Sequence, residues 1–390
     1  NLTAPVISLV TAISTMLATG GSAVIMRKAG QQKAQEANED FTFLIAVNVA
    51  VGLIMSGLGY LIMDRLFERM SLSPAVAGYC RIYLSRYLIF TVPILLMNNF
   101  TLYMIAAGKS ALSMVCSITG GVLNMVLDYV LISVFDMGIA GAAIATGLGY
   151  SVTAVAGLVI FSKKDCLLHF VKPVCRIRTL ISAASNGSSE MAAALVTGIV
   201  TMMFNWTMLK YVGENGVAAI TIIMYVLMFA TSLYTGYSYG VAPMISFYYG
   251  EQNQDKLKKL IRLSMKIIVF IGAAAMIVSL AVTEPLVAIF ARPDNPVYDL
   301  AVTGNRICSS ALVFIGFNVF ASGMFTALSN GLVSAVLAFS RSFVFMVAAM
   351  LILPAILGVT GAWLATPAAE AAAFLLSAVM FIKYRKKYQY

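Results

Sequence analysis

Apolar residues run along this chain in long segments that are separated by short polar or glycine-containing connections. A helix needs about 20 consecutive apolar residues to cross the hydrocarbon core of a bilayer. Eleven segments meet this length, at residues 4–26, 41–63, 83–106, 111–135, 139–162, 180–207, 216–243, 262–283, 301–326, 332–353 and 360–382. The pattern therefore predicts an all-α polytopic membrane protein with eleven spans.

The composition excludes a soluble protein. Of the 390 residues, 61% are hydrophobic and only 11% are charged, whereas a soluble domain carries about 25% charged residues. No segment combines the short apolar core and the small-residue cleavage site of a signal peptide. The five cysteines form no CxxC pair, and we expect them to be small apolar residues rather than disulfides or metal ligands.

The formal net charge of +10 is distributed unevenly over the predicted connections. With the basic tail at 383–387 placed in the cytoplasm, eighteen basic residues fall on the cytoplasmic side and seven on the other. This bias follows the positive-inside rule. We therefore predict a cytoplasmic C-terminus in the plasma membrane, and we attribute the charge to membrane topology rather than to nucleic-acid binding.

The sequence contains an internal repeat, in which position n of the first half corresponds to position n + 220 of the second. Identities recur in register at Thr15/Thr235, Gly30/Gly250, Asn98/Asn318, Phe100/Phe320, Gly141/Gly361, Thr146/Thr366 and Phe161/Phe381, among others. Matching spans lie six apart, so the two halves share one orientation. We expect two pseudo-symmetric helical bundles related by an axis along the membrane normal, with a binding site near their interface.

The span at 180–207 has no counterpart, because its partner would precede residue 1. We therefore expect six spans in each bundle of the intact protein, with the first helix missing from this chain. The predicted organisation is an N-terminal bundle at 1–162, a basic cytoplasmic linker at 163–179 and a C-terminal bundle at 180–390.

The apolar run at 110–135 contains two polar residues, Asn124 and Asp128. Residues four apart share one face of a helix, so the amide and the carboxylate line the same stripe. A carboxylate inside a span costs about 2.5 kcal/mol or more and by default indicates an ion or proton path. The alternative is that Asp128 lies near a helix end, hydrated or paired, with a structural role only.

Two further acids lie inside predicted spans. Glu370 is near the middle of the last span, after Pro367, and Glu190 shares a helical face with Thr197 and Thr201. Either acid would attract a cationic substrate or carry a proton. The alternative for both is a buried hydrogen bond to a neighbouring helix.

The aromatic and methionine content is typical of a cavity that accepts varied ligands. Tyr225 belongs to a group of four tyrosines in one span, Tyr150 lies one turn after Thr146, and the chain has 23 methionines. Aromatic faces attract organic cations, and methionine adapts to varied shapes. Most of these side chains nevertheless have the alternative of facing lipid or packing between helices.

Enzymatic function is disfavoured by the residue inventory. The sequence at 236–240, GYSYG, matches the GxSxG nucleophile pattern, but the only histidine, His169, falls in a basic connection. No HExxH, P-loop or dinucleotide motif is present in the sequence. We therefore predict no enzyme activity and no organic cofactor.

Several motifs together carry a resemblance to a known family. They are GGSAVIMRKAGQQKAQEAN (20–38), LNMVLDYVLI (123–132), MGIAGAAIATGLG (137–149), NGSSEMAAALVTGIVTMMFNWTML (186–209), GVAAITIIMYV (216–226) and GVTGAWLATPAAE (358–370). In this order they resemble the MATE (multidrug and toxic compound extrusion) transporters, bacterial multidrug-efflux branch. The resemblance implies two six-helix bundles around a central cavity and export of organic cations in exchange for H⁺ or Na⁺. The chain departs from the family by lacking the first helix, which in many members contributes a carboxylate to the cation site.

The resemblance also implies a cation site in the N-terminal bundle. Asn124 and Asp128 match its amide and carboxylate, Asn98 matches a polar residue of the preceding helix, and Thr146 matches a hydroxyl in the following helix. These hard oxygen ligands suit Na⁺, whereas Asp128 alone would exchange a proton. The alternatives are a helix-packing hydrogen bond for Asn98 and a bond from Thr146 to its own helix.

Three function classes remain open from the sequence. The first is a monomeric, cation-coupled antiporter that exports drug-like organic cations and contacts membrane lipids. The second is a flippase for lipid-linked oligosaccharides or polysaccharides, whose pyrophosphate cargo requires several arginines or lysines in the cavity; here Arg341 is the main deep cation. The third is a non-transporting receptor or a channel. A two-fold repeat with buried acids fits a transporter that works by alternating access better than it fits either of these.

Overall fold

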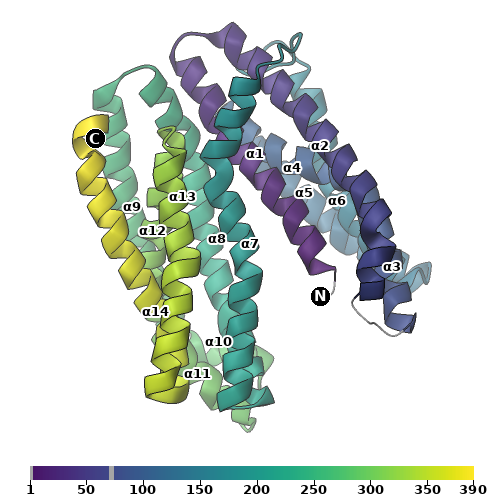
Figure 1. Ribbon diagram of the computed structural model, residues 1–390, viewed down its shortest axis with the longest axis vertical. Helices are drawn as coiled ribbons and strands as arrows, with labels where there is room; N and C mark the ends of the chain where they lie inside the picture. The colour runs from purple at the N-terminus through teal and green to yellow at the C-terminus, as the bar shows by residue number, and fades with distance from the viewer. Residues whose placement is uncertain (1–2, 70–73) are drawn as a thin grey trace. The chain divides into compact units, whose positions relative to one another are not determined.

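The computed structural model describes residues 3–69 and 74–390, and within these ranges the chain forms helices joined by short connections, with no strand (Figure 1). Two compact units divide it, Asn1–Met191 and Ala192–Tyr390. The prediction of an all-α fold is confirmed. The assignment of 163–179 as the linker between the bundles stays a prediction.

Helix α7 (Ile177–Tyr211) crosses the boundary between the two units. The first unit contains α1 (Ala4–Gly30), α2 (Ala34–Arg69), α3 (Pro74–Ile89), α4 (Thr91–Ala106), α5 (Ser110–Asp128), the π-helix η1 (Tyr129–Val134) and α6 (Gly138–Phe161). The second contains α8 (Glu214–Gly250), α9 (Gln254–Ala281), α10 (Thr283–Phe290), α11 (Pro296–Cys308), the 3₁₀ turn η2 (Ser309–Ala311), α12 (Leu312–Ala327), α13 (Gly331–Phe339), the π-helix η3 (Ser340–Phe345) and α14 (Met346–Tyr388).

The helices account for the predicted spans. Among the described residues, nine helices are long and apolar enough to cross a membrane, or ten if the bent pair α3–α4 is one span. The longest runs from Gly331 to Tyr388, but Gly358 interrupts it with φ 59° and ψ −134°. In Figure 1 the chain turns back within α14 and returns toward the C-terminus. Dividing this segment at Gly358 gives the eleven spans that hydropathy predicts.

The internal repeat is visible in the backbone. Gln32 and Gln252 correspond to each other in the repeat, and both have positive φ, 62° and 57°. The hydrogen bonds that close these two turns also correspond, from Lys33 N to Lys28 O and from Asn253 N to Tyr248 O, each 3.1 Å. A positive φ is uncommon outside glycine. Its recurrence at one offset therefore supports two pseudo-symmetric bundles.

The offset changes from 220 to 221 in the middle of each unit. Helix α4 runs from Thr91 to Ala106 and α12 from Leu312 to Ala327, so their first and last positions correspond at the larger offset. The hydroxyl of Ser113 bonds the carbonyl of Thr101, and the hydroxyl of Ser334 bonds that of Ser322, again at 221. Asn98 and Asn318 therefore match in the sequence at the offset of 220, but they do not occupy corresponding positions in the two units.

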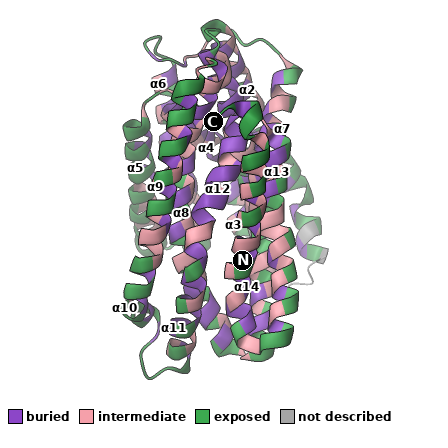
Figure 2. Ribbon diagram, turned by 90° about the vertical axis from the view of Figure 1, so that its left-hand side faces the viewer, coloured by how far each residue is buried: buried purple, intermediate pink, exposed green. Residues whose placement is uncertain are grey.

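Each unit closes around one largely buried helix, α4 in the first and α12 in the second. In Figure 2, α12 is purple along most of its length. In the first unit, Phe41 contacts Phe161 and Phe170 with ring centroids 5.0 and 5.2 Å apart. Phe170 belongs to the segment after α6, so this connection is packed against the bundle rather than lying free.

Hydrogen bonds and ion pairs also hold this connection. Asp40 is fully buried near the start of α2. Its carboxylate pairs with Lys28 at 2.5 Å and with Arg176 at 3.0 Å, and it accepts a hydrogen bond from Thr179 at 3.2 Å. Because three donors from other segments converge on one buried carboxylate, Asp40 fixes the end of the connection to α1 and α2.

We expect Asp40→Asn to destabilise the first unit by about 3 kcal/mol, because it breaks a buried ionic network. The measurement is the thermal unfolding midpoint, together with the rate of trypsin cleavage after Lys163 and Lys164, which should rise. The control is Asp165→Asn, since Asp165 is exposed in the same connection. Equal effects of the two variants would contradict this role for Asp40.

Candidate functional site

Helices α5 and α6 touch backbone to backbone at two glycines. A Cβ on Gly120 would lie 2.5 Å from the carbonyl oxygen of Gly149, and a Cβ on Gly149 would lie 3.0 Å from the Cβ of Asn124. Small residues allow such an approach between membrane helices. This contact brings the polar face of α5 directly against α6.

Asn124 and Thr146 meet beside this contact. The Asn124 amide lies 3.5 Å from the Thr146 hydroxyl, which itself donates to the carbonyl of Ala142 at 2.9 Å. Both residues line a cavity of about 230 Å³. The other lining residues are Met97, Ser117, Gly120, Gly121, Gly149, Tyr150 and Thr153. The hydrogen bond from Thr146 to its own helix is therefore present, which is the alternative to ligation named from the sequence. A ligand role for Thr146 stays a prediction.

Asp128 is the last residue of α5, four residues beyond Asn124, and is half-buried. Its Oδ1 atom is buried and has no hydrogen-bond partner within the described part of the chain. None of the ion pairs found there involves Asp128. The π-helix η1 begins at the next residue, and such segments are frequent at functional sites. A buried carboxylate oxygen without a donor favours binding of a proton or a cation.

Two other residues proposed for this bundle have different surroundings. The amide of Asn98 donates to the hydroxyl of Ser14 on α1 at 3.0 Å. This is the helix-packing bond that the sequence left open, and a coupling role for Asn98 stays a prediction. Tyr150 lines the cavity with Asn124 and packs in a cluster with Tyr87 and Ile94.

In the second unit, Glu370 forms a buried ionic network. Its side chain on α14 is only 4% exposed. The Arg341 Nε atom, in the π-helix η3, donates to both carboxylate oxygens, at 2.8 and 3.0 Å. The Asn318 amide on α12 donates to the same carboxylate at 2.8 Å. Two other elements, η3 and α12, therefore hold the charge of Glu370, and the predicted bond from Glu370 to a neighbouring helix is an ion pair.

This network lies at the wall of a larger cavity of about 690 Å³. Its polar lining consists mostly of hydroxyl groups: Thr197, Thr201, Thr231, Ser232, Thr235, Tyr239, Ser342 and Thr366. Its apolar lining includes Met224, Met228, Met346 and Phe204. Arg341 is the one basic residue among the lining residues that the structure describes, and Glu370 the one acid. The cavity is therefore wide, adaptable and close to neutral.

The two cavities occupy corresponding places in the repeat. At the offset of 220, Thr146 and Tyr150 of the small cavity correspond to Thr366 and Glu370 of the large one. Arg341 corresponds to Gly120 or Gly121, depending on whether the offset is 221 or 220. The same scaffold therefore has an open, glycine-lined wall in the first unit and an ion pair in the second.

Glu190 and Tyr225 lie away from these cavities. Glu190 is half-buried on α7 and is not among the residues that line either cavity. Tyr225 is 53% exposed and stacks on Phe290 with centroids 6.2 Å apart, at a separate surface pocket. Sequence reasoning identified Arg341 and Glu370 as deep charges but did not pair them. The opposite charges of these two residues were the feature of the sequence from which an ion pair could have been predicted.

Comparison with known proteins gives consistent matches. The MatE family profile matches residues 1–130 and 190–352. The multidrug export protein MepA of Staphylococcus haemolyticus is 24% identical over 390 residues, which is 98% of this chain and 84% of the relative. The MepA of Staphylococcus aureus strain bovine RF122 is 22% identical over 98% of this chain and 84% of its own length.

Solved structures show the same fold. A crystal structure of MATE in complex with MaL6 superposes with a TM-score of 0.95 at 22% identity, covering 100% of this chain and 88% of the other. The outward-facing conformation of a multidrug resistance MATE family transporter of the MOP superfamily gives 0.94 at 21% identity, with 100% and 87% covered.

We expect Gly120→Ala to destabilise the protein by about 1–3 kcal/mol, because the new methyl group would collide with the Gly149 carbonyl and force the helices apart. The matched control is Gly121→Ala, since a Cβ there meets nothing within 4 Å and alanine has the higher helix propensity. Thermal unfolding midpoints of the two variants check this. A midpoint for Gly120→Ala at or above that of Gly121→Ala would refute the close contact.

We expect Glu370→Gln to lower the free energy of unfolding by about 3 kcal/mol, because it leaves the partly buried Arg341 charge without its counter-ion. The control is Glu284→Gln, which removes an exposed pair with Arg306 and should cost about 0–1 kcal/mol. Removing both partners, as Arg341→Gln/Glu370→Gln, should recover part of the loss in a double-mutant cycle of unfolding free energies. A cycle with no coupling energy would argue against the pair.

Proposed function

Because the chain belongs to the MatE family, we propose that it is a cation-coupled antiporter that exports drug-like organic cations by alternating access. The observation that carries the proposal is Asp128, whose buried Oδ1 has no hydrogen-bond partner among the described residues. The multidrug export proteins that it resembles along 98% of its length support drug-like compounds as cargo.

Asp128 is proposed as the coupling carboxylate, with H⁺ or Na⁺ as the coupling ion. A charged carboxylate in a membrane span is costly, so a bound proton or cation stabilises it. Asn124, four residues earlier on α5, and the hydroxyl of Thr146 on α6 offer further oxygen atoms at the small cavity, whose lining residues do not include Asp128. Such oxygen ligands suit a hard cation, whereas a proton requires the carboxylate alone.

The large cavity of the second unit is proposed as a cargo site. Its methionines and hydroxyl groups suit ligands of varied shape. Glu370 would contact a cationic cargo only after Arg341 moves away, because the ion pair already neutralises it. For Glu190, Tyr150 and Tyr225 a substrate-binding role stays a weaker proposal.

The flippase alternative expects a cavity rich in basic residues. Among the described lining residues the large cavity has only Arg341, and Glu370 neutralises that charge. The balance of charge therefore favours organic cations over a pyrophosphate-linked cargo. We further propose that the protein acts as a monomer in the plasma membrane, with its basic C-terminus in the cytoplasm.

The test is ethidium efflux from vesicles that contain the full-length protein, under an imposed pH gradient and, separately, a Na⁺ gradient. We expect one gradient to drive efflux in the wild type and Asp128→Asn to abolish that response. The ion whose gradient drives efflux is then the coupling ion.

The matched control is Asp136→Asn. Asp136 is exposed in the turn before α6 and has φ 51°, a conformation that asparagine also adopts. This variant should pump normally. If Asp128→Asn also pumps like the wild type, coupling belongs to Glu190 or Glu370. Absence of efflux from well-folded wild type would turn the assignment toward the flippase.

A further inference from the structure

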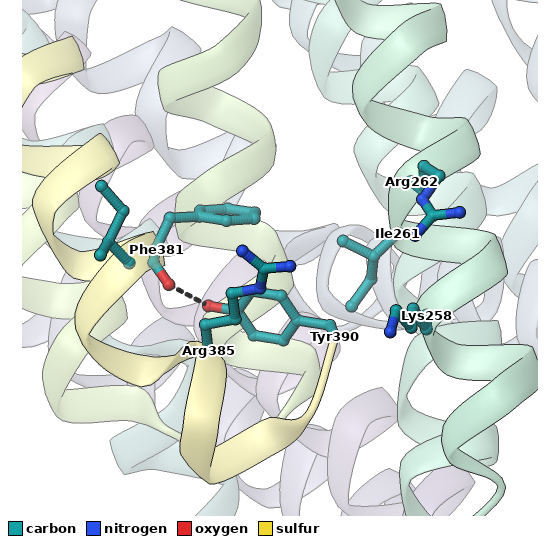
Figure 3. Close-up of a pocket in the computed structure, with 7 residues that line it drawn as sticks. Lys258, Ile261, Arg262, Phe381, Arg385 and Tyr390 are labelled. Carbon is teal, nitrogen blue, oxygen red and sulfur yellow. Dashed lines mark hydrogen bonds between the residues drawn. The ribbon is translucent and has the colours of Figure 1, made fainter.

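A second kind of site lies at the ends of α9 and α14. A pocket of about 250 Å³ lies between them (Figure 3). Its lining residues are Lys258, Ile261, Arg262, Phe381, Ile382, Arg385 and Tyr390. In Figure 3, Lys258 and Arg385 lie on opposite sides, with Tyr390 between them. The hydroxyl of Tyr390 donates to the carbonyl of Phe381 at 2.9 Å, so the aromatic floor is fixed.

Within the part of the chain that the structure describes, no ion pair joins the three cations of this pocket, Lys258, Arg262 and Arg385, to an acid. No Asp or Glu is among the described residues that line the pocket either. The basic charge is therefore concentrated in one concave place and is not balanced there.

The first unit shows what occupies the corresponding groove. At the offset of 220, Lys258 and Arg262 correspond to Asn38 and Thr42. There the connection after α6 fills the groove: His169 N donates to Asn38 Oδ1 at 2.9 Å, and Val171 N donates to Thr42 Oγ1 at 3.1 Å. Between these two bonds, Phe170 stacks on Phe41.

Two of the three corresponding apolar residues are aromatic in both grooves, and Tyr390 takes the place in the second groove that Phe170 takes in the first. Phe41, Phe161 and Phe170 of the first unit correspond to Ile261, Phe381 and Tyr390 of the second. The polar residues at the rim of each groove differ in kind. Asn38 and Thr42 accept hydrogen bonds from backbone N–H groups, whereas Lys258 and Arg262 only donate. A ligand that contacts Lys258 and Arg262 beside Tyr390 must therefore supply acceptors and negative charge.

We propose that this pocket binds the phosphate group of an anionic membrane lipid. Phosphate offers only acceptors and matches arginine and lysine donors. The pocket begins within the first turns of α9, at the end of a membrane-spanning segment. Ile382, which is 75% exposed, lies at its edge and offers an apolar surface for an acyl chain. Basic pockets between transmembrane helices are known to bind lipid head groups.

The test is native mass spectrometry of the purified full-length protein, titrated with dioleoyl phosphatidylglycerol. Parallel titrations use dioleoyl phosphatidylcholine and inorganic phosphate. The variant is Lys258→Gln/Arg385→Gln, with one change on each helix. The control is Lys259→Gln/Lys386→Gln, which removes equal charge from the neighbouring exposed residues that do not line the pocket.

We expect phosphatidylglycerol to bind to the wild type and to the control, and the pocket variant to bind about tenfold more weakly than the control. Equal weakening in both variants would overturn the site, because it would reflect general surface charge. Equal binding of phosphatidylcholine would overturn the requirement for a negative head group. Binding of inorganic phosphate that is sensitive to the pocket variant, without binding of the lipid, would overturn the lipid as its source. None of these readouts requires transport, so they are independent of the proposed function.

Discussion

The cost of burying charge in an apolar medium governs this structure. Asp40 satisfies the requirement with Lys28, Arg176 and Thr179. Glu370 satisfies it with Arg341 and Asn318. In both cases the partners come from different segments, so the charge also fixes how those segments pack. Asp128 differs, because its buried Oδ1 has neither a hydrogen-bond partner nor an ion pair among the described residues. This oxygen is free to accept a proton or cation from outside the chain, as the proposed coupling role of Asp128 requires.

The internal repeat lets one scaffold carry two kinds of chemistry. Thr146 and Thr366 hold corresponding places, yet four residues later the first unit has Tyr150 and the second has Glu370. Where the second unit places Arg341, the first has Gly120 and Gly121, and Gly120 allows α5 to touch α6 at Gly149. The glycine contact requires a residue without a side chain, and the ion pair requires an arginine at the corresponding position. Each unit can therefore have only one of the two arrangements. This separates a small polar site from a wide, nearly neutral cavity.

The sequence predicted the helices and their number well, since a membrane span must satisfy its backbone hydrogen bonds internally and so is read from hydropathy. The helical register also placed Asn124 and Asp128 on one face correctly, because i and i+4 is a local relation. Arg341 and Glu370 were recognised as deep charges but not as a pair. Their contact depends on the rotation of two helices about their axes, which hydropathy does not specify. The same holds for Asp40 and Arg176, which are far apart in the sequence but joined by a hydrogen bond.

The grooves at the ends of α2 and α9 show how the repeat constrains what can change. Their aromatic floor is kept, because Phe161 and Phe381 pack against the core of their own units. The residues at the rim differ between the two units, because they contact the segment or ligand that lies in the groove. In the first unit the rim residues accept hydrogen bonds, and the chain itself supplies the N–H groups. In the second the rim residues donate and carry charge. A peptide backbone cannot neutralise that charge, so the chemistry of the rim selects an anion even though the shape of the groove is inherited.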